Sequence, residues 1–73
     1  MTPKYHINLF FSDADGCWVA DVPDLRCCSA LGDSAEQALR EVQRAIKTWL
    51  KAAKDLGKTI PKPKYRPAIY QVA

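Results

Sequence analysis

The chain has 73 residues, of which 48% are hydrophobic and 26% charged, and its formal net charge is +3. This length predicts a single domain, residues 1–73, and the apolar fraction excludes an intrinsically disordered polar chain. No apolar run has the roughly 18 residues of a membrane span, and no signal-peptide core is present, so we expect a cytoplasmic protein with no membrane partner.

The three cysteines are not spaced as a disulfide framework, because their number is odd and Cys27 and Cys28 are adjacent. We expect reduced thiols that pack as small apolar side chains, Cys17 included. An intersubunit disulfide or a contact with a soft metal at the Cys27-Cys28 pair is the alternative.

Residues 4–12 predict the first strand. The odd-numbered residues from Tyr5 to Phe11 are all apolar and predict a face turned toward the core, whereas Phe10 lies on the opposite face. The Asp-Gly pair that ends at Gly16 predicts a hairpin turn, because glycine readily adopts positive φ.

Residues 17–22 predict the return strand, with Val19 on the face away from the core. Pro23 ends this strand because it has no N–H group to donate. Residues 28–31 predict a short third strand, which Gly32 terminates.

Residues 34–56 predict one long amphipathic helix, because apolar residues recur there at spacings of three and four over six turns. Ser34 with Gln37, or Asp33 with Glu36, predicts a capping box at its start. A glycine directly after the range provides a left-handed stop.

The last part of the chain is rich in proline and lysine up to Pro67 and predicts an extended segment. Residues 68–72 predict a final strand at a sheet edge. The order is β-β-β-α-β, an α+β two-layer fold in which one helix covers one face of a small antiparallel sheet. Phe10 and Val19 remain on the other face, and a leftover apolar patch favours self-association or a partner.

The sequence contains no convincing catalytic set. Ser12, Ser29 and Ser34 occupy turn, strand and cap positions, and His6 is the only histidine. Four aspartates are numerous enough for a metal-dependent nuclease, but they lie in turns and at strand ends, where aspartate is expected for structural reasons. We therefore expect no enzyme, no metal and no cofactor.

Charge is distributed unevenly, since residues 1–37 are net acidic and residues 38–73 are net basic. Such asymmetry is typical of a partner surface, but a solvated helix face with a lysine-rich tail explains it equally well. The basic residues that a nucleic acid would contact are Arg40, Arg44, Lys47, Lys51, Lys54, Lys62, Lys64 and Arg66.

Several motifs occur in a characteristic order. They read GCWVADVPDL at residues 16–25, cysteine at Cys28, GDSAEQAL at residues 32–39 and GKTIPKP at residues 57–63. This order resembles the HicB-like antitoxin family, which has an aromatic-x-Ala strand, a Pro-acid-Leu turn, a cysteine step, a Gly-Asp-Ser/Thr helix start and an Ile-Pro-x-Pro exit. The chain departs from the family pattern at Arg26-Cys27, where members usually have Pro-Gly.

The resemblance implies a partial ribonuclease-H-like fold without nuclease activity and a role in a toxin–antitoxin system. The partner would be a small, basic, RNA-cleaving toxin of the HicA type, and members commonly form dimers or larger homo-oligomers. Full-length members often add a C-terminal DNA-binding domain for autoregulation, for which this chain leaves no room before Ala73, so the departure puts operator binding in doubt.

We therefore predict a non-catalytic protein-binding module that neutralises such a toxin. The predicted partner-binding residues are Asp13, Asp15, Asp21, Asp24, Phe10 and Val19. The alternatives are a nucleic-acid-binding protein that uses the basic residues named above, and a structural homo-oligomer in which residues 68–72 pair between chains.

Overall fold

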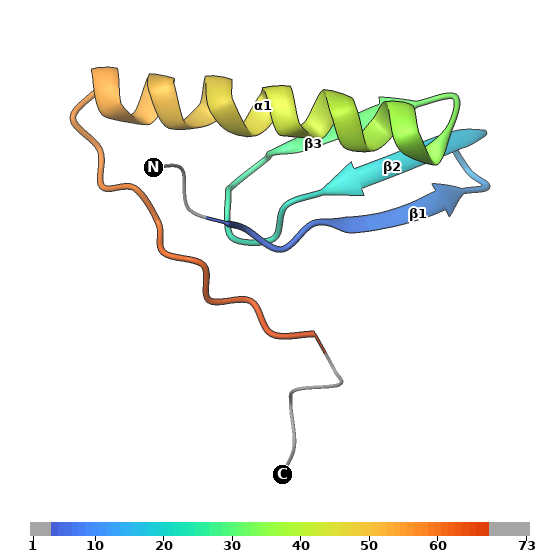
Figure 1. The fold of residues 1–73 in the computed structure, drawn as a ribbon, viewed down its shortest axis with the longest axis horizontal. Helices are drawn as coiled ribbons and strands as arrows, with labels where there is room; N and C mark the ends of the chain where they lie inside the picture. Colours follow the sequence, from blue (N-terminus) through green and yellow to red (C-terminus); the bar gives the residue numbers. More distant parts are fainter. Residues whose placement is uncertain (1–3, 68–73) are drawn as a thin grey trace, which may run out of the picture.

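A computed structural model describes residues 4–67 and contains a three-stranded sheet and one helix (Figure 1). The elements are β1 (Asn8–Ser12), β2 (Cys17–Asp21), β3 (Ser29–Gly32) and α1 (Ala35–Asp55). The sheet is antiparallel with strand order β1-β2-β3, and α1 lies across one face of it, mainly over β3 and β2. The predicted α+β two-layer architecture is confirmed in this part of the chain, while the predicted strand at residues 68–72 lies outside the described residues.

The first strand is shorter than predicted, since residues 4–7 are not part of it. The reason lies in β2, the one strand that pairs with it within residues 4–67. The last paired residue of β2 is Asp21, which lies opposite Asn8, and the Val22 N–H group turns away to donate to the Cys28 carbonyl at 3.0 Å. Residues 4–7 therefore have no paired strand among the described residues and precede β1 as an arm.

The turn between β1 and β2 is built as the Asp-Gly signal predicts. Gly16 adopts a φ of 66° and donates its N–H group to the Ser12 carbonyl at 2.8 Å. The Ser12 hydroxyl donates to the Asp15 carboxylate at 2.9 Å and accepts from the Asp15 N–H group. These local bonds hold the acidic tip of the hairpin in one conformation.

The boundaries of α1 also follow from local signals. The Ser34 side chain accepts from the Gln37 N–H group at 3.1 Å, and the Gln37 side chain accepts in turn from the Asp33 N–H group at 2.7 Å. At the other end Gly57 has a φ of 70°, and its N–H group and that of the next residue bond back to carbonyls of the last turn. This is the Schellman arrangement expected of a glycine stop.

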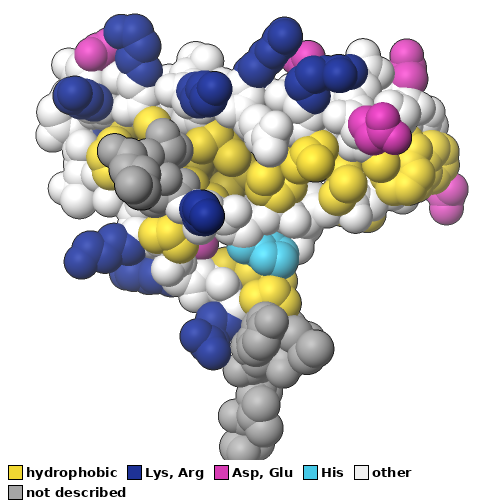
Figure 2. Space-filling model, viewed as in Figure 1, with side chains coloured by type: hydrophobic (Ala, Val, Ile, Leu, Met, Phe, Trp, Pro, Cys, Tyr) yellow, Lys and Arg dark blue, Asp and Glu magenta, His cyan; other side chains and the backbone are white. Residues whose placement is uncertain are grey.

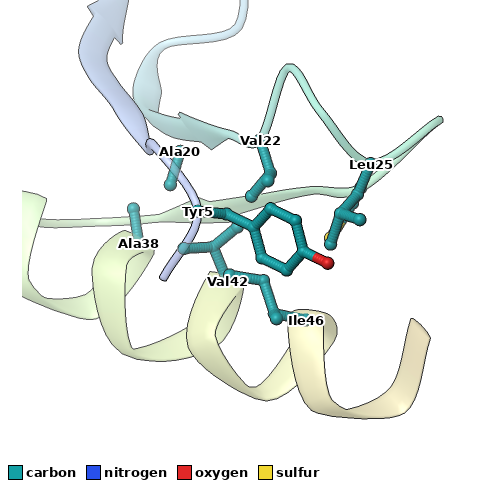
Figure 3. Packing of buried hydrophobic residues seen from close by; sticks show 8 residues of the cluster. Tyr5, Ala20, Val22, Leu25, Ala38, Val42 and Ile46 are labelled. Atoms are coloured by element: carbon teal, nitrogen blue, oxygen red, sulfur yellow. The ribbon is translucent and has the colours of Figure 1, made fainter. Parts of the chain in front are cut away.

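The core lies between α1 and the β2–β3 half of the sheet (Figure 3). Its largest fully buried side chains are Leu25, Val22 and Val42, and the Tyr5 ring packs among them beside Ile46. Leu25 comes from the loop after β2, which the sequence pattern marks only as a turn. A loop residue thus fills the centre of the core because α1 extends well beyond the ends of the strands.

The helix covers β1 only in part, which falls short of the expectation for the odd-numbered residues of the first strand. Leu9 and Phe11 point to the same face as buried Ala20, yet they remain 40% and 50% exposed. The cause is the position of α1 mainly over β3 and β2, which gives the far strand of the sheet the least contact with the helix. Of the predicted inward-facing residues in the arm before β1, Tyr5 is buried in the core and Ile7 packs against it while partly buried.

The segment after α1, residues 58–67, returns toward the arm and contacts both the arm and the loop after β2. The Tyr5 hydroxyl donates to the Pro61 carbonyl at 2.6 Å, and the Asp24 carboxylate accepts from the backbone N–H groups of Lys64 and Tyr65 at about 3.0 Å. The Tyr65 ring packs against the His6 ring with centroids 4.7 Å apart. Burial, and secondarily the Asp24 charge, raises the pKa of Tyr5, so its hydroxyl stays protonated and able to donate.

Candidate protein-binding surface

The face of the sheet opposite α1 carries an apolar row that crosses all three strands. Phe10 of β1 lies opposite Val19 of β2, which lies opposite Leu31 of β3, and we call these three side chains the outer row. Phe10 and Leu31 are 48% and 58% exposed. Neighbouring strands stand about 4.8 Å apart, so the outer row extends for about 10 Å across the sheet.

Polar residues flank the outer row on both sides. Toward one end of the strands Asn8, Asp21 and Ser29 stand side by side on the same face, and toward the other end Ser12 lies opposite Cys17. Beyond Ser12 the hairpin tip follows, with the exposed residues Asp13 and Asp15. The surface is therefore an apolar strip with carboxylates at both ends, a pattern typical of the core and rim of a protein interface.

The predicted partner-binding residues do not all meet on this surface. Phe10, Val19 and Asp21 share the outer face, and Asp13 and Asp15 border it. Asp24 instead follows β2 in the next loop, and its carboxylate holds the backbone of the return segment. Its geometry assigns it a structural role.

The structure adds Leu31 to this surface, which the sequence reasoning did not select. The register of β2 with β3 places Leu31 beside Val19, while its neighbour Ala30 turns toward the helix. The signal was present in the alternation of the strand, but a four-residue strand carries too little periodicity to assign a face.

The basic residues form two separate groups. Five of them are exposed along α1 on the side away from the sheet, where Figure 2 shows a row of dark blue side chains. Two of these five are paired with acids, Arg44 with Glu41 at 3.5 Å and Lys51 with Asp55 at 3.3 Å. The other group is exposed on the return segment and consists of Lys62, Lys64 and Arg66.

The turn at Arg26-Cys27, where the family usually has Pro-Gly, keeps the backbone conformation of a glycine turn. Cys27 adopts a φ of 58°, the left-handed conformation that glycine favours, and is the one non-glycine residue with positive φ in the described part of the chain. The Trp49 indole N–H group donates to the Arg26 carbonyl at 2.9 Å and fixes the turn on α1. The turn thus keeps a glycine-like backbone although cysteine occupies the position.

Replacing Cys27 by glycine is expected to raise the free energy of unfolding by about 0.5–1 kcal/mol, because the left-handed strain is relieved while the flexibility of the unfolded chain increases. Chemical denaturation under reducing conditions measures the change. The matched control is Cys27→Ala, which also removes the exposed thiol but keeps the β-carbon, and should change stability little. If both variants changed the free energy of unfolding equally, the backbone of Cys27 would not be strained.

The two adjacent thiols differ in their surroundings. Cys27 is exposed, whereas Cys28 is buried in the core. Burial, and secondarily the Asp21 carboxylate, raises the pKa of Cys28, so this thiol stays protonated and unreactive where a free cysteine begins to ionise. Beside them a shallow groove runs between the turn and the second half of α1, lined mainly by Cys27, Trp49 and Ala52.

The polar groups that a catalytic site would use are engaged locally. The Ser12 and Ser34 oxygens bond within their turn and cap, and the His6 ring bonds to the Asn8 side chain at 2.7 Å. Within residues 4–67 no three His, Cys, Asp or Glu side chains cluster closely enough to hold a metal ion. Nor does any helix in this range combine the length and apolar character needed to cross a membrane.

The fold and the outer row together describe a small α+β domain with the features of a protein-binding module. A family model described as the HicB-like antitoxin of bacterial toxin–antitoxin systems matches residues 5–71. The chain therefore belongs to the HicB-like antitoxin family, as the order of its motifs indicates. No curated protein and no solved structure matches the chain. Membership indicates an antitoxin role, a toxin as the kind of partner, and a function by binding, since the family is generally non-catalytic.

Proposed function

We propose that this protein neutralises a small, basic, RNA-cleaving toxin of the HicA type by covering it with the outer face of the sheet. The observation that carries the proposal is the outer row itself, an exposed apolar strip with carboxylates at both ends on a member of an antitoxin family. A basic toxin that cleaves RNA must present cationic side chains around its active site, and the acids of this surface complement them.

The centre and the rim of this surface would contribute differently to binding. Phe10, Val19 and Leu31 supply apolar contact area at the centre, where most binding energy is concentrated. Asp13, Asp15 and Asp21 lie at the rim, where exposed charges accelerate association and select the partner more than they tighten the complex. The protein acts without catalysis in this scheme, because occupying the toxin's active site is sufficient to inhibit it.

The test compares one substitution at two places. Leu31→Lys inserts a cation into the outer row, and Leu56→Lys makes the same change at a residue that is 71% exposed at the end of α1. Leu31→Lys is expected to weaken toxin binding about a hundredfold and to abolish rescue of cells that express the toxin. Leu56→Lys should change the dissociation constant by less than about threefold.

The toxin for this experiment is the small basic protein encoded by the neighbouring reading frame, and affinity is measured by calorimetry beside the rescue assay. Equal binding by both variants would show that the outer row is not the interface. Absence of any toxin-like neighbour, together with failure to rescue cells from HicA-type toxins, would contradict the antitoxin proposal itself.

Nucleic-acid binding by the basic residues is the competing function, and it has weaker support. The cations of α1 are interrupted by the Glu41 and Asp55 ion pairs, and those of the return segment form a separate group. Binding through these residues predicts an affinity for RNA or DNA that falls steeply with salt concentration. A gel-shift assay at low salt without a shifted band would exclude it.

A further inference from the structure

Asp21 differs from the other acids of the outer face because it lies within the sheet rather than in the hairpin tip. It belongs to β2, the central strand of the described sheet, and is partly buried, whereas Asp13 and Asp15 are exposed. Its neighbours across the two strand pairs are Asn8 and Ser29. Because strand side chains stand roughly perpendicular to the sheet, this carboxylate has a defined position on the surface.

The Asp21 carboxylate makes no ion pair and no side-chain hydrogen bond with any residue in the range 4–67. Its neighbour Asn8 is bonded to the His6 ring instead, at 2.7 Å. The carboxylates of Asp15 and Asp24 are engaged, the first within its turn and the second with the return segment. A partly buried anion has already lost part of its hydration, so pairing it with a cation requires less further desolvation.

An exposed aromatic ring lies diagonally across from this carboxylate. Asn8 faces Asp21, and Phe10 is two residues further along β1 on the same face, so one long side chain can reach both groups. The Phe10 side chain is 48% exposed and stacks on no other ring within residues 4–67. A guanidinium group fits this pair, because it donates two parallel N–H groups to a carboxylate and also stacks on an aromatic face.

We propose that Asp21 and Phe10 bind one arginine of the toxin, with its guanidinium group paired to the carboxylate and stacked on the ring. This inference rests on the proposed function, because it names a contact within the same interface. It gives Asp21 a different role from the exposed acids of the hairpin tip. Those acids accelerate the encounter, whereas a partly buried ion pair slows dissociation and selects a partner that has an arginine at this place.

The experiment measures the association and dissociation rates of the full chain with the small basic toxin encoded by the neighbouring reading frame, by surface plasmon resonance. Asp21→Asn keeps the size of the side chain but removes its charge, and it is expected to raise the dissociation rate about thirtyfold. Asp13→Asn is the matched control, since it removes the same charge from the exposed hairpin tip. It should change the dissociation rate by less than about threefold.

Variants of the toxin identify the group that Asp21 binds. Each toxin arginine is replaced in turn by lysine, which keeps the charge but not the two parallel donors. One of these replacements should raise the dissociation rate from the wild-type chain strongly. The same replacement should change dissociation from the Asp21→Asn variant by less than about twofold, because the pair is already broken there. Phe10→Leu removes the ring but keeps an apolar contact, and it should weaken binding of the wild-type toxin about fivefold.

Circular dichroism and thermal unfolding of each variant should match those of the wild type, because the substituted groups lie on the outer face and not in the core. If the wild type binds toxin but Asp21→Asn and Asp13→Asn dissociate equally fast, the arginine contact is overturned and the proposed function stands. An effect of Asp21→Asn that couples to no toxin arginine would also overturn the contact. Failure of the wild type to bind the toxin would instead overturn the proposed function, and the contact with it.

Discussion

Replacing Gly32 by alanine is expected to destabilise the domain by about 3 kcal/mol. A β-carbon at this position would lie 2.5 Å from the Ala38 nitrogen and 3.0 Å from its Cα, both backbone atoms of the first turn of α1. Neither atom moves unless β3 and α1 separate, and that separation would open the core that lies between α1 and the sheet. The measurement is urea unfolding followed by circular dichroism, with the midpoint moving to much lower denaturant concentration.

The matched control is Gly57→Ala. Gly57 has a positive φ but nothing within 4 Å of the added β-carbon, so alanine there should cost only the left-handed strain, about 1 kcal/mol. If both substitutions lowered the free energy of unfolding equally, β3 would not approach α1 as closely as described. Because so small a domain has little stability to lose, Gly32→Ala should leave much of the protein unfolded at physiological temperature.

Truncating Leu25 to alanine is expected to cost about 3 kcal/mol, although this residue lies in a loop. Its side chain is only 1% exposed and packs in the core with Val22, Val42 and the Tyr5 ring. The substitution removes apolar contact and leaves a cavity that the surrounding backbone cannot readily close, because Leu25 and Cys28 are joined by a backbone hydrogen bond of 3.2 Å. Thermal and urea unfolding both report the loss.

Leu31→Ala provides the comparison, since it makes the same chemical change at an exposed strand position. Its effect on the free energy of unfolding should stay within about 0.5 kcal/mol. Under the proposed function, however, the same variant should bind toxin less tightly, because Leu31 belongs to the outer row. We therefore expect Leu25→Ala to lose more stability and Leu31→Ala to lose more toxin affinity. That result would distinguish a core residue from an interface residue. A Leu25→Ala variant as stable as Leu31→Ala would contradict the packing of the loop.

The elements with local signals were predictable from the residues themselves. The Asp15-Gly16 turn, the cap formed by Ser34 and Gln37, and the stop at Gly57 each depend on backbone groups within five residues, so no distant contact is needed to form them. The family resemblance rested on the same motifs, and the family match confirms it. Strand lengths were less predictable, because β1 extends only as far as β2 accompanies it.

The sequence by itself determined the order of the elements, their caps and turns, and the family, because these depend on residue type and spacing along the chain. The tertiary structure alone decided where α1 lies on the sheet, and with it which apolar residues are covered. Leu25 is buried and Leu9 is exposed for that reason, although periodicity suggests the reverse. Coverage depends on contacts between residues far apart in the chain, as at Gly32 and Ala38, where the absence of a side chain lets strand and helix meet. The same placement leaves the outer row exposed on the other face of the sheet, and so makes it the surface on which the proposed function depends.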